Sequence, residues 1–418
     1  MTESPPRHIL IFEPDERGHA REWFEHLTNF AAERHPDVKV TLAVPRSLAS
    51  ALDIPSSIGI ETLTVEEEGK SLHHKLAVSG MGRWNAMQNH LASSGADYGF
   101  FLGLDHITLP LALGLRGRRP VSGILFRPSA HYDDTAAARA SLPERIRDLR
   151  KKLLYALMLR NPALDIVFSL DPYFLSTVSG SKVRGLVDPA FPLPEASILT
   201  GAAIEPPPGR VVFLLFGEIS ERKGLLALFD ALGRLDARIA ERIAVLIAGR
   251  IDPALRDIAA TRSAELRTAL PLWLTFDDRF LPSEDLAALV RRADVILAPY
   301  QRFVGSSGVM LWAASARKPI ITQDYGLIGR LTRDHGLGLA IDTTDADALA
   351  SAMTGAVMRG AEALAEEDAM AAFAAYRTPR RFAATIFDGV LKRDASKNEP
   401  KRISEMQQTC TGHASFLR

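Results

Sequence analysis

The segment Val304–Asp324, VGSSGVMLWAASARKPIITQD, decides how the second half of this 418-residue chain folds. The small residues Gly305-Ser306-Ser307-Gly308 precede an apolar stretch of helical periodicity, which ends at Arg317-Lys318-Pro319 before the strand-like IIT. A helix that starts at small residues leaves its first backbone N–H groups open, and the helix dipole adds positive charge there. We therefore expect Ser306, Ser307 and Gly308 to bind a phosphate group. The alternative is that serine only caps the helix, which requires no ligand.

A second phosphate-binding element is predicted upstream, in VVFLLFGEISERKGLLALF (211–229). A buried strand runs into a turn at Gly217, and Arg222-Lys223-Gly224 then opens a helix. Two such elements on one sheet could hold a diphosphate from both sides, which points to a nucleotide-sugar site. The alternative is that Arg222 and Lys223 are solvated charges without a ligand.

Composition limits the class of protein. The length allows two domains, each with its own core, and a hydrophobic content of 47% with a mean hydropathy of +0.01 indicates an ordered globular chain. Fifty basic residues balance fifty acidic ones, which argues against a nucleic-acid partner. The single cysteine, Cys410, excludes an internal disulfide or a cysteine-based zinc cluster and favours a reducing compartment.

No apolar run is long enough to span a bilayer, and the N-terminal MTESPPRHILIFEP lacks the apolar region of a signal peptide. We expect a cytoplasmic protein, at most peripheral to the inner face of a membrane. The stretch 143–160, PERIRDLRKKLLYALMLR, has apolar residues at helical spacing among basic ones. Such a helix can lie on anionic lipid, although a helix packed on a sheet with a solvated face gives the same pattern.

Apolar runs alternate with longer amphipathic stretches, the pattern of parallel sheets covered by helices. The predicted strands are HILIFEP, VKVTLAVP, YGFFLG, VSGILF and DIVFSLD in the first half, and VVFLLFG, IAVLIAG, LWLTFDD, DVILAPY and PIITQD in the second. Six prolines between Asp188 and Arg210 predict a linker between two doubly wound α/β domains. The predicted division is a first domain, a linker, a second domain, a final helix and a polar, disordered tail, at 1–190, 191–209, 210–378, 379–393 and 394–418.

The second half, from about Val211 to Leu391, resembles the C-terminal domain of the GT-B glycosyltransferases, in particular the retaining group 1 (family 4) enzymes related to sucrose and glycogen synthases. Four blocks carry the resemblance in the same order: FGEISERKG, LIAGR, FLPSEDLAALVRRADVILAPY and GSSGVMLWAASARKPIITQDYGLIGRL. The resemblance implies two Rossmann-like domains that face each other across a cleft. It also implies a nucleotide-sugar donor in the second domain, an acceptor in the first, and no metal or other cofactor.

Some residues match the family pattern and others depart from it. The resemblance implies that Lys223 gives a cation to the donor diphosphate near Gly217, with Arg222 as a second cation. Glu218 stands where the family tends to place arginine. The family signature Glu-x7-Glu, whose carboxylates contact the donor sugar and the ribose, falls on Val304 and Trp312. Both carboxylates are therefore missing, which leaves the donor identity and the stereochemical outcome open.

The nucleotide base is expected near Phe280 and Leu281, with Trp312 in the ribose vicinity. The alternative for Phe280-Leu281-Pro282 is a hydrophobic staple before a Ser283 N-cap. Asp345-Ala346-Asp347 looks like the metal-binding Asp-x-Asp of the other glycosyltransferase fold, GT-A. Because it opens a helical stretch, where carboxylates favour the positive helix end, we assign no metal to it.

The catalytic candidates in the first half are His19, Asp105, His106 and His131, which all lie just beyond predicted strand ends. A base or an orienting hydrogen bond at the reacting sugar would need such residues. The alternative is that they are ordinary loop residues.

These patterns favour a metal-independent glycosyltransferase that moves a sugar from a nucleotide diphosphate donor to a hydroxyl of a glycan, lipid-linked or small-molecule acceptor. The loss of both glutamates keeps two alternatives open: an inactive GT-B protein that binds a nucleotide or glycan, and a nucleotide-sugar epimerase of the same fold. The chain has no dinucleotide fingerprint, Walker-type loop or His-Glu-x-x-His, which weakens dehydrogenase, NTPase and metalloprotease readings.

Overall fold

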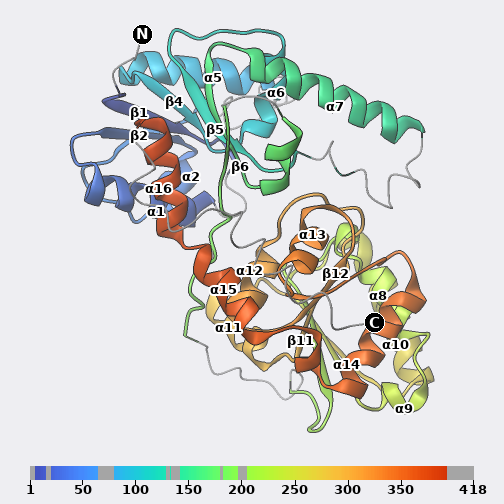
Figure 1. Cartoon of the computed structure of the whole chain (residues 1–418). Helices are drawn as coiled ribbons and strands as arrows, with labels where there is room; N and C mark the ends of the chain where they lie inside the picture. Colours follow the sequence, from blue (N-terminus) through green and yellow to red (C-terminus); the bar gives the residue numbers. More distant parts are fainter. Residues whose placement is uncertain are drawn as a thin grey trace. The chain divides into compact units, whose positions relative to one another are not determined.

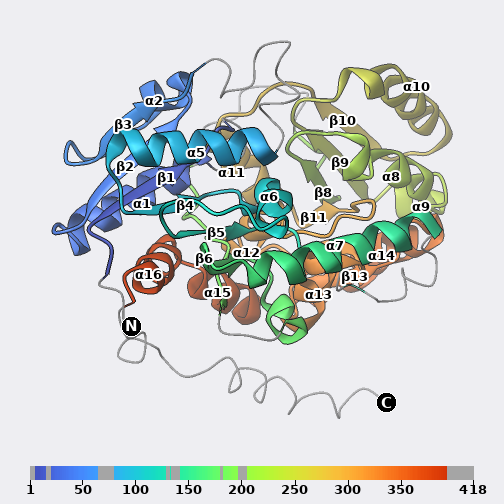
Figure 2. The same cartoon turned by 90° about the horizontal axis from the view of Figure 1, so that it is seen from above.

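The computed structural model describes residues 5–15, 20–64, 80–128, 132, 142–178, 182–195 and 205–392. The chain divides into two compact units. Of the described residues, unit 1 holds those up to 128, those within 142–188 and those from Pro379 to Lys392. Unit 2 holds Tyr132 and the described residues between Pro189 and Thr378. Figures 1 and 2 show an α/β sheet structure in each unit.

Unit 1 contains a seven-stranded sheet in the order β3-β2-β1-β4-β5-β6-β7, with every pair parallel. Its strands are β1 (His8–Phe12), β2 (Lys39–Val44), β3 (Gly59–Thr62), β4 (Tyr98–Phe101), β5 (Val121–Leu125), β6 (Leu164–Ser169) and β7 (Val183–Gly185). The strand order reverses between β1 and β4. In such sheets ligands bind beyond the carboxyl ends of the strands at this reversal.

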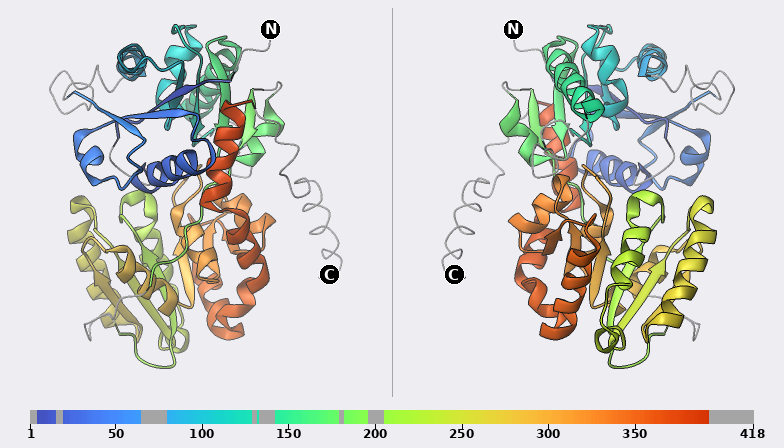
Figure 3. Two further views of the ribbon diagram at one scale, coloured as in Figure 1. Left: turned by 90° about the vertical axis from the view of Figure 1, so that its left-hand side faces the viewer. Right: turned by 90° about the vertical axis from the view of Figure 1, so that its right-hand side faces the viewer.

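Helices cover both faces of the unit 1 sheet (Figure 2). Apolar residues of α5 (Gly80–Ser94), α6 (Thr108–Ala112) and α7 (Leu142–Arg160) form one core with the strands, while α1 (Ala20–Arg34) packs against α16 (Pro379–Val390). Trp23 of α1 contacts Phe382 of α16 with ring centroids 4.7 Å apart. The last described helix of the chain therefore completes unit 1, and Figure 3 shows it in red beside the blue α1. The short helix α2 (Arg46–Ala51) follows β2.

Unit 2 contains a six-stranded parallel sheet in the order β10-β9-β8-β11-β12-β13. The strands are β8 (Val211–Phe216), β9 (Ile243–Ala248), β10 (Trp273–Asp277), β11 (Val295–Ala298), β12 (Ile320–Gln323) and β13 (Gly338–Ile341). The helices are α8 (Leu225–Leu232), α9 (Ala237–Ala240), α10 (Pro253–Ala269), α11 (Ser283–Arg292), α12 (Gly308–Ser315), α13 (Gly326–Asp334), α14 (Ala346–Arg359) and α15 (Glu367–Tyr376). Here the strand order reverses between β8 and β11.

The predicted fold class, two doubly wound α/β domains with parallel sheets, is confirmed. All ten predicted strands are present, and the three that the sequence did not indicate are β3, β7 and β13. These three strands lie at sheet edges, are three or four residues long and are not fully buried, so they carry no continuous apolar run.

The segment between the units contains no helix or strand in its described residues, 189–195 and 205–209. It includes Pro189, Pro192, Pro194, Pro206, Pro207 and Pro208. Proline lacks the N–H that a helix interior or a central strand requires. Within the described part of the chain, no helix combines the length and hydrophobicity needed to cross a bilayer.

Candidate functional site

The residue after β8 is Gly217, which begins the turn that leads to the predicted cations. Its amide donates to the Ala248 carbonyl at the end of β9, at 3.0 Å, and its φ is 99°, a value that favours glycine. A Cβ at this position would lie 3.3 Å from the Lys223 Nζ. The Lys223 ammonium therefore lies directly over Gly217, at the carboxyl edge of the unit 2 sheet.

Lys223 is buried, with 7% of its surface exposed, so the alternative of a solvated charge is wrong for this residue. Its Nζ donates to the Phe216 carbonyl at 3.2 Å and to the Tyr300 hydroxyl at 2.9 Å. Gly224, which follows, has φ 77°, and a Cβ there would lie 1.9 Å from the Pro299 carbonyl oxygen. The fold requires both residues of the Lys-Gly pair. Gly224 allows the backbone to approach the Pro299 carbonyl, and the Lys223 side chain folds back over the end of β8.

Tyr300 connects this lysine to the start of α12. Its hydroxyl lies 2.7 Å from the Ser307 Oγ, which accepts the Val309 amide at 3.2 Å and so caps the helix. The Gly308 amide donates to no described residue. The structure thus brings Gly217, Lys223, Ser307 and Gly308 together. Sequence reasoning missed Tyr300, whose signal was its place at the end of the run DVILAPY, two residues after β11.

Arg222 lies at the same edge but is exposed. Its guanidinium carbon is 4.6 Å from the centre of the Phe303 ring and 5.5 Å from that of Tyr300. Stacking on aromatic faces positions the guanidinium without using its N–H groups. Half-buried Ser306 immediately precedes the Ser307 cap.

The residues predicted near the base and ribose are placed at the carboxyl edge of the same sheet. Phe280 follows β10 and is 73% exposed, and Leu281 is half-buried. The alternative of a Ser283 N-cap is wrong, because Pro282 occupies the N-cap position and no side chain caps α11. Trp312 is half-buried on α12, and its ring meets Phe216 edge-on with centroids 6.4 Å apart.

Asp345 acts as the N-cap of α14. Its Oδ1 accepts the amides of Asp347 at 2.9 Å and Ala348 at 3.4 Å, while Asp347 lies 3.8 Å from the Arg234 guanidinium. This is the capping role that the sequence favoured over a metal site. The described residues contain no group of three or more His, Cys, Asp or Glu side chains able to hold a metal ion.

In unit 1, two of the predicted catalytic residues follow β4 in the 3-10 helix η1 (Leu104–Ile107). The Asp105 carboxylate accepts the amides of Phe126 at 2.7 Å and Arg127 at 3.0 Å, beyond the end of β5. Burial raises the pKa of Asp105, and these two bonds oppose the rise. Both oxygens hold the adjacent loop in place, so Asp105 is structural. His106 is exposed, and partial burial lowers the pKa of its ring.

Three residues that sequence reasoning did not single out lie beside His106. Glu13 follows β1 and is buried, Asp15 lies two residues further, and Arg83 comes from α5. Arg83 donates to both Asp15 oxygens, at 2.9 and 3.2 Å, and the His106 Nε2 is 3.8 Å from the Asp15 Oδ2. Burial raises the pKa of Glu13 to about 7. The only sequence signal was the position of Glu13 at a strand end.

The predicted catalytic residues His19 and His131 lie outside the described residues. So do residues 394–418 of the predicted tail.

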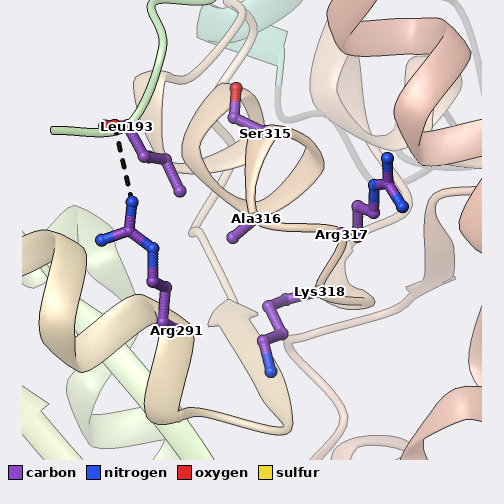
Figure 4. Close-up of a pocket in the computed structure, with 6 residues that line it drawn as sticks. All are labelled: Leu193, Arg291, Ser315, Ala316, Arg317 and Lys318. Atoms are coloured by element: carbon purple, nitrogen blue, oxygen red, sulfur yellow. Dashed lines mark hydrogen bonds between the residues drawn. The ribbon is translucent and has the colours of Figure 1, made fainter. Parts of the chain in front are cut away.

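A cavity of about 530 Å³ lies at the opposite edge of the unit 2 sheet, between the end of α12 and the start of β12 (Figure 4). Arg291 donates there to the Pro194 carbonyl at 2.7 Å, and Arg317 pairs with Glu367 at 2.7 Å. These arginines hold segments of unit 2 together. The cavity lies away from the Lys223 network, because Lys318-Pro319 precede β12, whereas the network lies beyond strand carboxyl ends.

Residues 210–358 match the family model described as Glycosyl transferases group 1. A phosphatidyl-myo-inositol mannosyltransferase from Mycolicibacterium smegmatis is 30% identical over 165 residues, which are 38% of this chain. The matched part spans only 39% of that relative.

Solved structures share the fold at low identity. Sucrose-phosphate synthase from Thermosynechococcus elongatus has a TM-score of 0.67 at 17% identity, covering 94% of this chain and 99% of its own. The Escherichia coli trehalose-6-phosphate protein bound with UDP-2-fluoro glucose has a TM-score of 0.65 at 12% identity, covering 92% and 99%. Anabaena Alr3699/HepE in complex with UDP has a TM-score of 0.59 at 13% identity, covering 93% and 100%. The fold is therefore of the GT-B type.

Proposed function

From the match of residues 210–358 to the group 1 glycosyltransferases, we propose that the chain transfers a sugar from a nucleotide diphosphate donor to an acceptor hydroxyl. The observation that carries the proposal is the network of Lys223, Tyr300 and Ser307 at the carboxyl edge of the unit 2 sheet. It fixes a buried cation beside the start of α12, whose Gly308 amide is free among the described residues.

This arrangement suits a diphosphate for a physical reason. As the glycosidic bond breaks, negative charge builds up on the leaving diphosphate, and fixed donors that need no rearrangement stabilise that charge. Lys223 uses two of its three protons on the Phe216 carbonyl and the Tyr300 hydroxyl, so one proton is left for a phosphate oxygen. Arg222, stacked on Phe303, is the second cation of the proposal.

Uridine diphosphate is the donor leaving group to test first, since Anabaena Alr3699/HepE and the E. coli trehalose-6-phosphate protein are described with UDP or a UDP-sugar. A thermal-shift screen with UDP, GDP, ADP and dTDP and their sugars compares it with the others. We expect one nucleotide to raise the melting temperature of the wild-type protein and to raise that of Lys223→Met much less. Equal shifts in both proteins would contradict the site.

We propose that the reaction requires no metal, because Lys223 and Arg222 supply the positive charge that a metal would otherwise provide. Release of nucleoside diphosphate from the preferred donor should continue in excess EDTA. Complete loss of turnover that manganese restores would contradict this.

A second candidate function is nucleotide or glycan binding without transfer. Val304 and Trp312 occupy the positions of the two motif glutamates, and Trp312 lies beside Phe216 at the end of β8, so no carboxylate replaces the ribose contact there. Donor-dependent release of nucleoside diphosphate separates the two functions. Analysis of the sugar product separates transfer from epimerisation.

We further propose that unit 1 contacts an anionic membrane surface through α6 and α7, which would bring a lipid-linked acceptor within reach. Six of the eleven exposed large hydrophobic residues of the described chain lie on these helices or at the C-cap of α6: Leu109, Leu113, Ile146, Leu149, Leu153 and Leu157. Those on α7 follow helical spacing along one face, and Arg145, Arg147, Arg150 and Lys152 are exposed on the same helix. Exposed aliphatic side chains among cations favour an anionic bilayer surface over bulk water.

The test is co-sedimentation with phosphatidylcholine vesicles, with and without phosphatidylglycerol. The wild-type protein should bind the anionic vesicles, and high salt should weaken binding. Leu149→Glu with Leu153→Glu should abolish it, while Ile258→Glu, a matched change at an exposed position on α10, should not. Equal binding by both variants, or no binding by the wild-type protein, would contradict membrane contact.

A further inference from the structure

The cavity of about 530 Å³ at the amino edge of the unit 2 sheet lies where two helices end (Figure 4). Helix α11 ends at Arg292, and α12 ends at Ser315 before the turn into β12. Three of the six residues that line the cavity are cations, and none is acidic: Leu193, Arg291, Ser315, Ala316, Arg317 and Lys318. All six belong to unit 2, so the cavity forms within one compact unit.

Arg291 is held in position through one of its nitrogen atoms. Its Nη2 donates to the Pro194 carbonyl at 2.7 Å and to the Leu193 carbonyl at 3.5 Å (Figure 4). The Nε and Nη1 atoms make no hydrogen bond with any described residue, so their N–H groups remain for a ligand. A ligand here would meet donors that are already oriented, which lowers the entropy cost of binding.

Lys318 is half-buried, and its ammonium makes no hydrogen bond or ion pair with any described residue. The end of α12 attracts cations through the helix dipole and its free carbonyl groups. The Lys318 ammonium nevertheless bonds to none of these carbonyls. A partly buried charge of this kind has lost hydration without gaining a partner. An anion in the cavity would supply that partner.

Arg317 occupies a position that favours glycine. Its amide donates to the Ala314 carbonyl at 3.1 Å and the Lys318 amide donates to the Ala313 carbonyl at 2.9 Å, the pattern of a Schellman turn. The φ of Arg317 is 54°, and this left-handed conformation is strained for an arginine. The side chain pairs with Glu367, but both side chains are more than half exposed, and such pairs contribute little to stability. Contact with a ligand accounts for an arginine at this position.

The charges of the lining residues indicate the ligand. Among the described ion pairs, only that with Glu367 neutralises a lining cation, so three cations less one carboxylate leave two positive charges. Two charges match a phosphate group near neutral pH. We propose that the cavity binds a phosphate group, free or on a small phosphate ester, through Arg291 and Lys318, with the exposed Arg317 beside them. The site is separate from the Lys223 network, so the inference goes beyond the proposed function and does not depend on it.

The test is titration calorimetry of the full chain with potassium phosphate and, separately, with glycerol 3-phosphate, at constant ionic strength. We expect Lys318→Met to raise the dissociation constant about tenfold or more, because a charge-assisted hydrogen bond is lost. Arg238→Met removes an exposed cation of α9, before β9 at the same edge of the sheet, and should bind as the wild type does. Tighter binding of glycerol 3-phosphate would support an ester as the occupant, and tighter binding of phosphate would support the free ion.

Arg317→Gly tests the strained turn. In phosphate-free buffer this variant should melt no lower than the wild type, because glycine adopts the left-handed conformation without strain. It should also bind phosphate more weakly. A lower melting temperature with unchanged phosphate affinity would show that Arg317 acts only through its pair with Glu367.

Two lysine variants separate the cavity from the proposed diphosphate site. Lys318→Met should weaken phosphate binding and keep the wild-type nucleotide affinity, while Lys223→Met should do the reverse. Equal phosphate affinity in the wild type and Lys318→Met, or no phosphate binding by the wild type, would overturn the cavity site and leave the transferase proposal intact. Unchanged nucleotide affinity in Lys223→Met would contradict the diphosphate site alone.

Discussion

Glu13 and Gly217 occupy the same place in the two units and differ in chemistry. Each is the first residue after the strand at which the strand order reverses, β1 in unit 1 and β8 in unit 2. The Glu13 amide donates to the Ala43 carbonyl of β2, and the Gly217 amide donates to the Ala248 carbonyl of β9. In unit 2 the residue has no side chain, and the Lys223 ammonium occupies the space above it. In unit 1 a buried carboxyl group occupies the corresponding position.

The comparison shows that the parallel sheet supplies only a location. The carboxyl ends of the strands and the strand reversal place both residues at an edge where a ligand can bind. The residue after the strand then decides whether that edge holds a fixed cation, as in unit 2, or a buried carboxyl group, as in unit 1. Fold and chemistry are therefore separable in this protein.

The largest expected effect concerns the pH dependence of stability. The pKa of Glu13 rises from 4.5 to about 7 on folding, so the folded state binds more protons between these values and stability falls as pH rises through 7. The full difference is about 3 kcal/mol. Urea unfolding at pH 5, 6, 7 and 8 should show Glu13→Gln gaining on the wild type as pH rises. A constant difference between the two proteins would contradict a buried, pKa-shifted Glu13.

The second prediction removes the cation of unit 2 while keeping its volume. Lys223→Met should weaken nucleotide binding by roughly ten- to over a hundredfold, because a charge-assisted hydrogen bond contributes ~1.5 to 3 kcal/mol. Titration calorimetry measures this, with Lys318→Met as a control lysine in the same unit. The variant also leaves the Tyr300 hydroxyl and Phe216 carbonyl without a donor, so its melting temperature should fall. Unchanged affinity would place the diphosphate elsewhere.

A smaller effect is expected for Tyr300, which connects Lys223 to the start of α12. Tyr300→Phe should destabilise the protein by about 1 kcal/mol, since Lys223 and Ser307 lose a shared partner. In a double-mutant cycle with Ser307→Ala, the double variant should lose less free energy of unfolding than the sum of the two single losses. Simple additivity in urea unfolding would show that the hydroxyl contact contributes nothing to the network.

The smallest effect is expected at Trp312. Because its side chain is half-buried and pairs with the Phe216 ring in a T-shaped arrangement, Trp312→Glu should cost less stability than burial of a carboxylate in a core position. We expect a change in nucleotide affinity or in the preferred donor, measured by the same calorimetry. A large fall in melting temperature with no change for any donor would show that Trp312 is a packing residue.

Local patterns predicted most of the fold and one half of the candidate site. The apolar strands, the small residues before α12 and the Lys-Gly pair depend on contiguous residues, so their periodicity is visible in the sequence. Short edge strands such as β3 and β13 were missed because partial burial leaves them without an apolar run. The capping role of Asp345 at the start of α14 was predicted correctly, because an N-cap bonds only amides two or three residues further along the chain.

The sequence by itself determined that two parallel α/β sheets form and that Lys223 and Ser307 lie near helix starts. Only the tertiary structure decided that Lys223 is buried and reaches Tyr300, 77 positions away, and that Arg83 binds Asp15 from 68 positions away. These contacts arise where strands that are distant in the chain end side by side, and no short-range pattern encodes them. Glu13 depends on the same cause: its burial comes from neighbours on α5 and after β4, which alone turn an ordinary glutamate into one with a pKa of about 7.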